Sequence, residues 1–372
     1  MKLSGMRIGL VGPLPPPSGG MANQTLQLAK LLREEGATVE LVQVNRPYRP
    51  HWINRLKGIR AVFRLLPYLA HLWQSAGKVQ VFHVMANSGW SWHLFAAPAI
   101  WIARITGVPV IVNYHGGEAG AFLDKAFFWI KPSLKRADAI MVPSGFLEAV
   151  FGKHGFSTSI VPNVIDLSRF STETDGKVSL KTNAPHIIVT RNLEPIYDNA
   201  TALRAFSIVR RSFPMATLVI AGSGPERGAL EKLAAGLGMT DAVIFTGRVD
   251  NEDMAALYRG ADIMVNPSLA DNMPISVLEA LASGIPVVST DVGGVPYLVE
   301  HGKTALLVPA QNPVAMADAI LAFLNEPAQA RQFSEAGKAS VQQYAWSKVC
   351  DRLLRVYEQV LTRTRTSAMD VK

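Results

Sequence analysis

Two acidic residues eight positions apart, Asp271 and Glu279, form a pair whose types and spacing suit chemistry on a polar ligand. A carboxylate accepts two hydrogen bonds and can therefore hold neighbouring hydroxyl groups. The residues between them predict a helix over roughly 274–283, because Pro274 suits its first position and Gly284 the position after its end. Asp271 then precedes the helix and Glu279 lies within it. The alternative is a helix with a dipole-stabilising Asp and a solvated Glu.

Two glycine-rich turns each follow a short apolar strand and precede a predicted helix. One spans residues 221–228 with Gly222 and Gly224, and the other spans 12–24 with Gly20. Such turns let a backbone approach a phosphate at the positive end of a helix. The first turn does not match the dinucleotide fingerprint, because an arginine replaces its third glycine. Tight packing of helix on strand is the alternative explanation.

Strands and helices alternate along the whole chain. Twelve short apolar strands are separated mostly by helical segments, which predicts α/β architecture with two doubly wound, mainly parallel sheets. In such sheets ligands bind at the carboxyl ends of the strands. We expect a first domain over 1–165, a polar linker over 166–185, and a second domain over 186–345. A last helix, 346–372, is expected to pack back on the first domain.

Composition indicates a globular protein, since 49% of the 372 residues are hydrophobic and 18% are charged. Cys350 is the single cysteine and cannot form an internal disulfide, which fits a reducing compartment. The first residues predict a strand and no signal peptide, so a cytoplasmic location is expected. The most apolar window, 90–112, is interrupted by two prolines and Arg104. It predicts a buried helix and strand and not a membrane span.

The excess positive charge lies in the first half of the chain. Residues 1–166 contain 17 Lys and Arg against 8 Asp and Glu, whereas residues 167–372 contain 20 against 21. No acidic residue occurs between Glu40 and Glu118. A long acid-free segment of this kind indicates a polyanionic neighbour.

Within that segment, residues 51–73 combine an apolar helical stripe with basic residues. The stripe contains Trp52, Leu56, Ile59, Phe63, Leu66 and Trp73, is expected to break or kink near Pro67, and is accompanied by Arg55, Lys57, Arg60 and Arg64. This composition is typical of a helix that lies on an anionic membrane surface. A core-facing helix with a solvated basic face is the alternative.

Several motifs occur together in a familiar order: YHGGE (114–118), VPNVID (161–166), TRNLEP (190–195), IAGSGPER (220–227) and the block 271–309. Over about residues 7–362 the chain resembles the retaining glycosyltransferases of family 4. The resemblance implies the GT-B fold, with two facing Rossmann-like domains and a cleft between them.

The resemblance also assigns roles to the acidic pair. In that family an E-x7-E pair lines the donor site, so Glu279 is expected to bind the ribose hydroxyls and Asp271 the transferred sugar. The sequence departs from the pattern because Asp271 is one methylene shorter than the family's glutamate. The loop and helix start around this acid supply further donor-binding candidates: Asn272, Met273, Pro274 and Ile275.

Arg191 matches a family arginine that contacts the diphosphate, but the lysine expected a few residues later is missing from positions 196–199. Arg227 or Arg248 are candidate substitutes. His115 matches a histidine that reaches the donor sugar and phosphate, although a structural role is the alternative. The remaining donor-binding candidates are Gly20, Gly222, Gly224, Arg248 and Val249. For Asn163 the alternative is a residue that only shapes a turn, and for Glu118 it is a surface residue.

The reaction implied is transfer of a sugar from a UDP- or GDP-linked donor to a hydroxyl acceptor with retained configuration, without a cofactor or essential metal. The basic helix suggests a lipid-linked acceptor at the inner face of the membrane, in polysaccharide or glycolipid assembly. A non-catalytic sugar-nucleotide-binding subunit of an assembly complex is the alternative. An epimerase or a phosphorylase is disfavoured by the acidic pair and by the lack of an evident cofactor lysine. No nucleic-acid-binding module is recognised.

Overall fold

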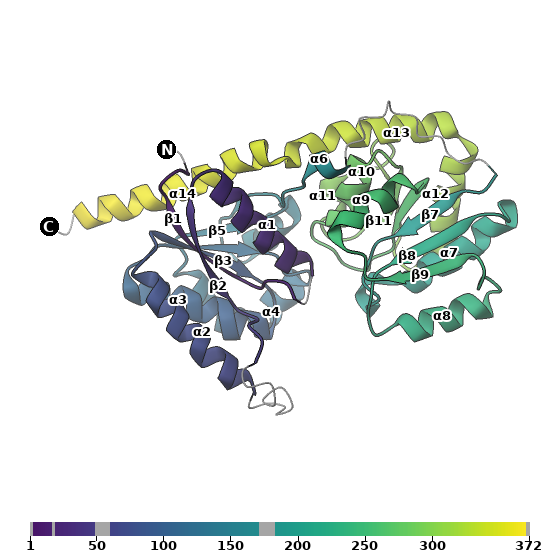
Figure 1. The fold of residues 1–372 in the computed structure, drawn as a ribbon. Coiled ribbons are helices and arrows are strands. Elements are labelled where there is room, and N and C mark those ends of the chain that lie inside the picture. The colour runs from purple at the N-terminus through teal and green to yellow at the C-terminus, as the bar shows by residue number, and fades with distance from the viewer. Residues whose placement is uncertain (1–2, 17–18, 49–59, 171–182, 370–372) are drawn as a thin grey trace. The chain divides into compact units, whose positions relative to one another are not determined.

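The computed structural model describes residues 3–16, 19–48, 60–170 and 183–369. The chain divides into two compact units, one formed by Met1–Val164 with Trp346–Lys372 and the other by Ile165–Ala345. Each unit contains a six-stranded parallel sheet with helices on both faces (Figure 1). The α/β class and the two doubly wound sheets predicted from the strand–helix alternation are therefore confirmed.

In the first unit the strand order is β2-β1-β3-β4-β5-β6. The strands are β1 (Arg7–Gly12), β2 (Thr38–Gln43), β3 (Val81–Ala86), β4 (Val110–Tyr114), β5 (Ala139–Val142) and β6 (Ser159–Ile160). The order reverses between β1 and β3, so the crevice at their carboxyl ends is the ligand position favoured by this topology.

The helices of the first unit form two layers. A shared core joins α2 (Arg60–Ala76), α3 (Ala97–Thr106, preceded by the π-helical turn Trp92–Ala96), α4 (Ala119–Leu134) and α5 (Gly145–Lys153). A second core joins α1 (Gly20–Glu34) and α14 (Trp346–Met369). Right-handed crossovers explain why the helices lie on two faces of the sheet. The chain moves from β1 to β2 in one direction across the sheet and from β3 to β6 in the other, so the connecting helices cover opposite faces.

The last helix is an integral part of this unit. Along α14, Leu353 and Tyr357 are buried in one core with residues of β1 and β3. The Tyr357 hydroxyl hydrogen-bonds to Nδ1 of buried His83 at 2.8 Å, and Trp346 Nε1 donates to the Glu35 carboxylate at 2.9 Å.

In the second unit the strand order is β12-β11-β10-β7-β8-β9. The strands are β7 (His186–Val189), β8 (Thr217–Ala221), β9 (Val243–Gly247), β10 (Ile263–Asn266), β11 (Val287–Thr290) and β12 (Leu306–Val308). Because the order reverses between β10 and β7, the loops after these two strands flank the favoured ligand position.

Helices also cover both faces of the second sheet. One core contains α7 (Asn199–Ser212), α8 (Arg227–Gly236), α12 (Pro313–Asn325) and the start of α13 (Pro327–Ser340). The other contains α6 (Leu167–Phe170), α9 (Asn251–Arg259), α10 (Ile275–Ala282) and α11 (Val295–Leu298). Short 3-10 turns, Pro195–Tyr197 and Val341–Tyr344, complete the described elements.

Four local predictions need correction. Pro274 caps α10 and is not its first residue, and its ψ of 111° is extended. Helix α2 continues through Pro67, so the helix is not broken there, and a kink stays a prediction. Within 90–112, Trp101 and Ile105 are exposed, so that helix is only partly buried. The predicted linker includes the helical turn α6, whose Phe170 is buried, while residues 171–182 lie outside the described residues.

Candidate active site

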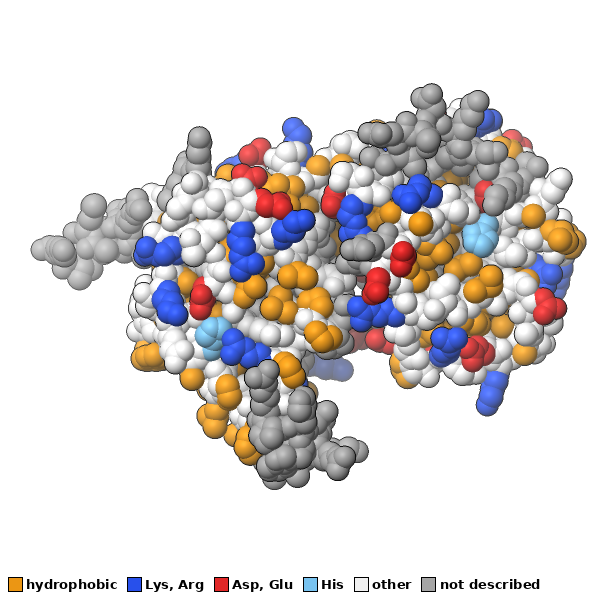
Figure 2. All heavy atoms as spheres, viewed as in Figure 1, with side chains coloured by type: hydrophobic (Ala, Val, Ile, Leu, Met, Phe, Trp, Pro, Cys, Tyr) orange, Lys and Arg blue, Asp and Glu red, His pale blue; other side chains and the backbone are white. Residues whose placement is uncertain are grey.

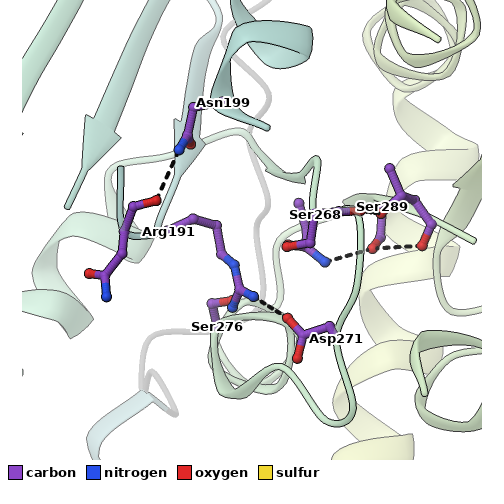
Figure 3. Close-up of polar contacts among 9 residues, drawn as sticks. Arg191, Asn199, Ser268, Asp271, Ser276 and Ser289 are labelled. Atoms are coloured by element: carbon purple, nitrogen blue, oxygen red, sulfur yellow. Dashed lines mark hydrogen bonds and ion pairs between the residues drawn. The ribbon is translucent and has the colours of Figure 1, made fainter. Parts of the chain in front are cut away.

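An arginine and an aspartate from the two switch-point loops of the second unit meet in an ion pair. Arg191 follows β7, and Asp271 lies in the loop between β10 and α10. Arg191 Nη2 pairs with Asp271 Oδ2, and Arg191 Nη1 donates to Ser276 Oγ at 3.2 Å (Figure 3). Parallel neighbours β7 and β10 end at the same edge, which explains why residues 80 positions apart come together.

The ion pair is largely removed from solvent and is further constrained by a tyrosine. The side chains of Arg191 and Asp271 are only 11% and 14% exposed. The Arg191 Cζ atom lies 4.2 Å from the centre of the Tyr197 ring, a stacked cation–π geometry. A guanidinium held by a ring, a carboxylate and a hydroxyl presents its donors in a fixed orientation, as recognition of a phosphate requires.

A buried polar network and two glycines fix the loop that carries Asp271. Asn266 Nδ2 donates to Ser289 Oγ at 2.9 Å, and Ser268 Oγ donates to Asn266 Oδ1 at 2.8 Å (Figure 3). The backbone N–H of Gly294 donates to the Asp271 carbonyl at 2.8 Å. A Cβ on either Gly293 or Gly294 would collide with the 271–272 backbone. These glycines therefore allow the loop to pack closely.

The glycine turn after β8 supports the segment that carries Arg191. A Cβ at Gly222 would collide with the Arg191 carbonyl, and one at Gly224 with the Leu193 carbonyl. The Leu193 N–H donates to the Ser223 carbonyl at 3.0 Å, which ties the two segments together. The alternative explanation of close packing thus accounts for both glycines, and a role in donor binding stays a prediction.

Glu279 is not a solvated helix residue. The Tyr258 hydroxyl donates to its Oε2 at 3.0 Å and also hydrogen-bonds to Thr190 Oγ1 at 2.8 Å. Burial raises the pKa of Glu279 to about 7, while the Tyr258 hydrogen bond and the charges of Arg169 and Arg191 act in the opposite direction. A half-buried carboxyl with such a pKa is typical of a functional site.

The other donor-binding candidates of the second unit lie in two places, at the start of α10 and after β9. Asn272, Met273 and Pro274 are buried and Ile275 is half-buried, so the Met273 side chain belongs to the core beneath α10. Any contact of Met273 with a donor must therefore come from its backbone. Arg248 and half-buried Val249 directly follow β9, at the far edge of the sheet.

The two arginines proposed to replace the missing lysine have partners of their own. Arg227 Nε donates to Glu231 Oε1 at 2.8 Å, and its Nη2 lies 3.4 Å from the Phe245 carbonyl. Exposed Arg248 lies 3.5 Å from the Asp250 carboxylate. Instead of a second cation, the segment 196–199 places the Tyr197 ring against Arg191.

In the first unit, a mainly apolar pocket is lined by a few polar side chains, among them His115, Asn113, Asn163, half-buried Gln24 and buried His83. Burial lowers the pKa of His115 to about 4, so its imidazole is neutral at pH 7. His83 Nε2 lies 3.1 Å from Asn113 Nδ2. A neutral imidazole donates one hydrogen bond and accepts another, which suits contact with hydroxyl groups.

The glycines beside this pocket differ in what they permit. A Cβ at Gly116 would collide with Ser88 Oγ, whose hydrogen bond to the Tyr114 hydroxyl measures 2.7 Å. Gly20, the first residue of α1, has no atom within 4 Å of such a Cβ, so packing does not explain it. Glu118 is exposed and precedes α4 without a side-chain cap, as its surface interpretation predicts.

The basic candidates of the first unit are only partly described. Arg55 and Lys57 lie outside the described residues, as does the side chain of Arg60 at the start of α2. Arg64 lies with its Cζ 4.1 Å from the centre of the Tyr48 ring. Another face of α2, with Tyr68 and Leu72, is buried in the core, so the helix does face the core. The stripe members Phe63, Leu66 and Trp73 are exposed and do not belong to that core face.

Several site residues were not singled out from the sequence. Neither Tyr258 nor Ser276 belongs to a local pattern that indicates chemistry, and only the fold brings them to Glu279 and Arg191. Gly293 and Gly294 had a recognisable signal, since a Gly-Gly pair after strand β11 indicates a close backbone approach.

Models of two glycosyltransferase families match consecutive parts of the chain. "Glycosyltransferase Family 4" matches residues 18–169, and "Glycosyl transferases group 1" matches residues 171–340. The chain belongs to glycosyltransferase family 4. The predicted GT-B fold is therefore confirmed, and the two units are its two Rossmann-like domains.

Relatives of this family 4 glycosyltransferase include enzymes of lipid glycosylation. It is 27% identical to the phosphatidyl-myo-inositol mannosyltransferase of Mycobacterium leprae, over 96% of this chain and 98% of the relative. It is 28% identical to the GDP-mannose-dependent alpha-(1-6)-phosphatidylinositol monomannoside mannosyltransferase of Mycobacterium tuberculosis, over 70% and 74%. The sucrose-phosphate synthase of Thermosynechococcus elongatus has a similar fold, with a TM-score of 0.75, 21% identity, and coverage of 96% and 100%.

Within the described part of this glycosyltransferase, no three His, Cys, Asp or Glu residues are arranged to hold a metal ion. No described helix is long and apolar enough to cross a membrane. The expectation of metal-independent transfer stays a prediction.

Proposed function

We propose that this glycosyltransferase moves a hexosyl group from a UDP- or GDP-linked donor to a hydroxyl group of a lipid-linked acceptor, with retention of configuration. The observation that supports this most directly is the placement of Arg191, Asp271 and Glu279 around the carboxyl ends of β7 and β10. In the proposal these side chains supply one cation for the phosphates and two carboxylates, of which Asp271 is paired with Arg191 and Glu279 accepts a hydrogen bond from Tyr258.

Each of the three side chains has a distinct role in the proposal. Glu279, held by the Tyr258 hydroxyl, accepts hydrogen bonds from the ribose hydroxyls. Arg191, oriented by Tyr197 and Ser276, binds the diphosphate and stabilises its charge as it leaves. Asp271 exchanges its Arg191 partner for hydroxyl groups of the transferred sugar.

The proposed chemical step uses no protein nucleophile, since the Asp271 carboxylate is paired with Arg191 and the Glu279 carboxyl accepts from Tyr258. The bond between the anomeric carbon and the phosphate oxygen breaks, and its electron pair stays on the phosphate. The acceptor oxygen attacks the oxocarbenium-like carbon from the face of the leaving group and transfers its proton to a phosphate oxygen. The protein supplies orientation and charge stabilisation. No cofactor takes part.

His115 contributes as a neutral group in this proposal. Because its pKa is lowered to about 4, it remains an imidazole throughout the neutral range. It donates a hydrogen bond to a sugar hydroxyl or to a phosphate oxygen without adding charge. Gly20, with open space around its Cα, leaves room for the same ligand.

The acceptor is inferred from charge and relatives. The positive excess of residues 1–166 and the exposed apolar stripe of α2 support contact with an anionic membrane. The names of the two mycobacterial relatives specify phosphatidylinositol-based acceptors. We therefore place the enzyme peripherally on the cytoplasmic face of the membrane, where it acts in glycolipid or polysaccharide assembly.

One observation favours a second candidate function, a non-catalytic sugar-nucleotide-binding subunit. Arg191 is already neutralised by Asp271, and the expected second cation is replaced by Tyr197. A site with little net positive charge would stabilise a leaving diphosphate poorly.

Turnover of sugar nucleotides tests both functions. Purified protein is incubated with UDP- and GDP-sugars, with and without phosphatidylinositol vesicles, and release of nucleoside diphosphate is followed. Turnover of one donor by the wild type but not by Asp271→Asn or Glu279→Ala supports the transferase. Sugar-nucleotide binding without turnover under any of these conditions supports the non-catalytic subunit.

A further inference from the structure

A second exposed apolar area lies on α3 and α4 of the first unit, and α3 packs against α2. In α4, Phe128 and Trp129 are 79% and 72% exposed, and their rings form an edge-to-face pair with centroids 5.3 Å apart. Two large neighbouring aromatic side chains in water indicate a surface that binds something.

The neighbouring helix extends this area. Trp101 Nε1 of α3 donates to Ser133 Oγ of α4 at 3.1 Å, so the two helices lie side by side. Trp101 and Ile105 are also exposed on α3. We call the residues Trp101, Ile105, Phe128 and Trp129 the α3–α4 surface.

Basic residues surround the α3–α4 surface. Arg104, Lys125, Lys131 and Lys135 are exposed, and none of them forms an ion pair with another described residue. The one acidic residue of α4, Asp124, lies 3.2 Å from His154 Nε2. Lys125 lies one turn before Phe128 and Lys135 two turns after it, so aromatic rings stand between cations along one stripe.

The same layer contains the exposed stripe of α2. Helix α2 packs on α3, and its Phe63, Leu66 and Trp73 are exposed. Figure 2 shows hydrophobic side chains gathered on the surface over α2 and α3. Apolar side chains are thus exposed on three adjacent helices of one layer.

From these observations we infer that the α3–α4 surface is a second membrane anchor, which inserts its aromatic side chains into an anionic bilayer while the surrounding lysines contact lipid phosphates. Aromatic rings between cations match the boundary between acyl chains and headgroups. The shortage of acidic residues matches an anionic surface better than the mixed charge of a protein interface. This inference rests on the proposed function, since a lipid acceptor requires the enzyme at the membrane.

The test measures vesicle binding of the full-length protein and requires no turnover. Partition onto vesicles of equal parts phosphatidylglycerol and phosphatidylcholine is compared for the wild type and for Phe128→Ala/Trp129→Ala. Each ring that loses its apolar contact is expected to lower partition about tenfold. Because both side chains are exposed, the melting temperature of the double variant is expected to stay near that of the wild type.

Two further variants separate the contributions. Leu26→Ala, which removes an exposed leucine from α1 in the opposite helix layer, is the matched control and is expected to bind like the wild type. Lys125→Gln/Lys135→Gln is expected to weaken binding to anionic vesicles only and to reduce its dependence on salt. Brominated lipids are expected to quench tryptophan fluorescence less in Trp129→Phe than in the wild type.

Unchanged vesicle binding by Phe128→Ala/Trp129→Ala would overturn the inference. Light scattering provides a second criterion. If the wild type is a dimer, and the double substitution dissociates the dimer but leaves vesicle binding unchanged, the surface binds a second copy of the chain and the inference is overturned. Donor hydrolysis without vesicles is measured in parallel. Its failure counts against the proposed transferase, while the vesicle result alone decides the anchor.

Discussion

The half-buried carboxyl of Glu279 is expected to make donor binding dependent on pH. Its pKa rises from an ordinary 4.5 to about 7, mainly because burial disfavours the charged form. The difference corresponds to about 3 kcal/mol in favour of the protonated carboxyl. If the ribose hydroxyls are bound by the carboxylate, affinity for a nucleotide sugar is expected to fall about tenfold between pH 8 and pH 6.

Isothermal titration calorimetry with a nucleotide sugar measures this directly. The diphosphate of such a donor is esterified at both ends and does not titrate in this range, so the slope reports on the protein. Glu279→Gln is expected to bind more weakly and with a flat pH profile. A 2′,3′-dideoxy donor is expected to flatten the profile of the wild type, because it lacks the hydroxyl groups that the carboxylate accepts.

The unfolding equilibrium provides an independent measure with a defined sign. A carboxyl whose pKa is raised in the folded state contributes stability that is complete below pH 4.5 and lost as the pH rises through about 7. The free energy of unfolding of Glu279→Gln, relative to the wild type, should therefore increase by up to about 3 kcal/mol between pH 4.5 and pH 8.

Tyr258→Phe sharpens the test because it removes a hydrogen bond that lowers this pKa. Its midpoint for donor binding is expected at higher pH than that of the wild type. The reasoning is refuted if the wild type and Glu279→Gln share one pH profile, or if Tyr258→Phe moves the midpoint to lower pH.

Three other outcomes are expected. Gly224→Ala should lower the free energy of unfolding by about 2 kcal/mol, because the added Cβ would collide with the Leu193 backbone. Gly228→Ala should raise it by about 0.5 kcal/mol, because this helical glycine in α8 has open space around it; urea titration measures both values. Tyr197→Ala should raise the KM for the donor about tenfold, because the aromatic ring orients Arg191, whereas Tyr197→Phe keeps the ring and should leave the KM unchanged. Equal KM values for the two variants in steady-state kinetics would contradict this role of the ring. Cys350, whose pKa burial raises to about 11, should resist maleimide at pH 7 until urea unfolds the protein, as followed by mass spectrometry.

Much of the fold was accessible from the sequence because strands, glycine turns and helix ends have local signals. The helix after Asp271 was predicted within one or two residues, since Pro274 and Gly284 act on their own neighbours. The alternation of strands and helices likewise predicted two parallel sheets. Such signals depend on residues close together in the chain.

The site was less accessible, because its contacts are long-range. The ion pair between Arg191 and Asp271 depends on β7 and β10 being neighbours, and no local pattern specifies strand order. The pKa of Glu279 depends on burial and on Tyr258, 21 residues earlier in the chain. Spacing and the family resemblance therefore made the acidic residues candidates, whereas the pKa of Glu279 and the partners of both residues required the fold.

The return of α14 to the first unit affects how the chain can fold during synthesis. The buried face of α14, with Val349, Leu353 and Tyr357, is synthesised after the whole of Ile165–Ala345. Until then β1 and β3 lack part of their apolar cover, whereas the second unit is complete as soon as Ala345 emerges. The second unit is thus free to fold before the first is finished, the reverse of the usual order from the amino terminus. A truncation before Trp346 would remove core from the beginning of the protein and not merely a tail.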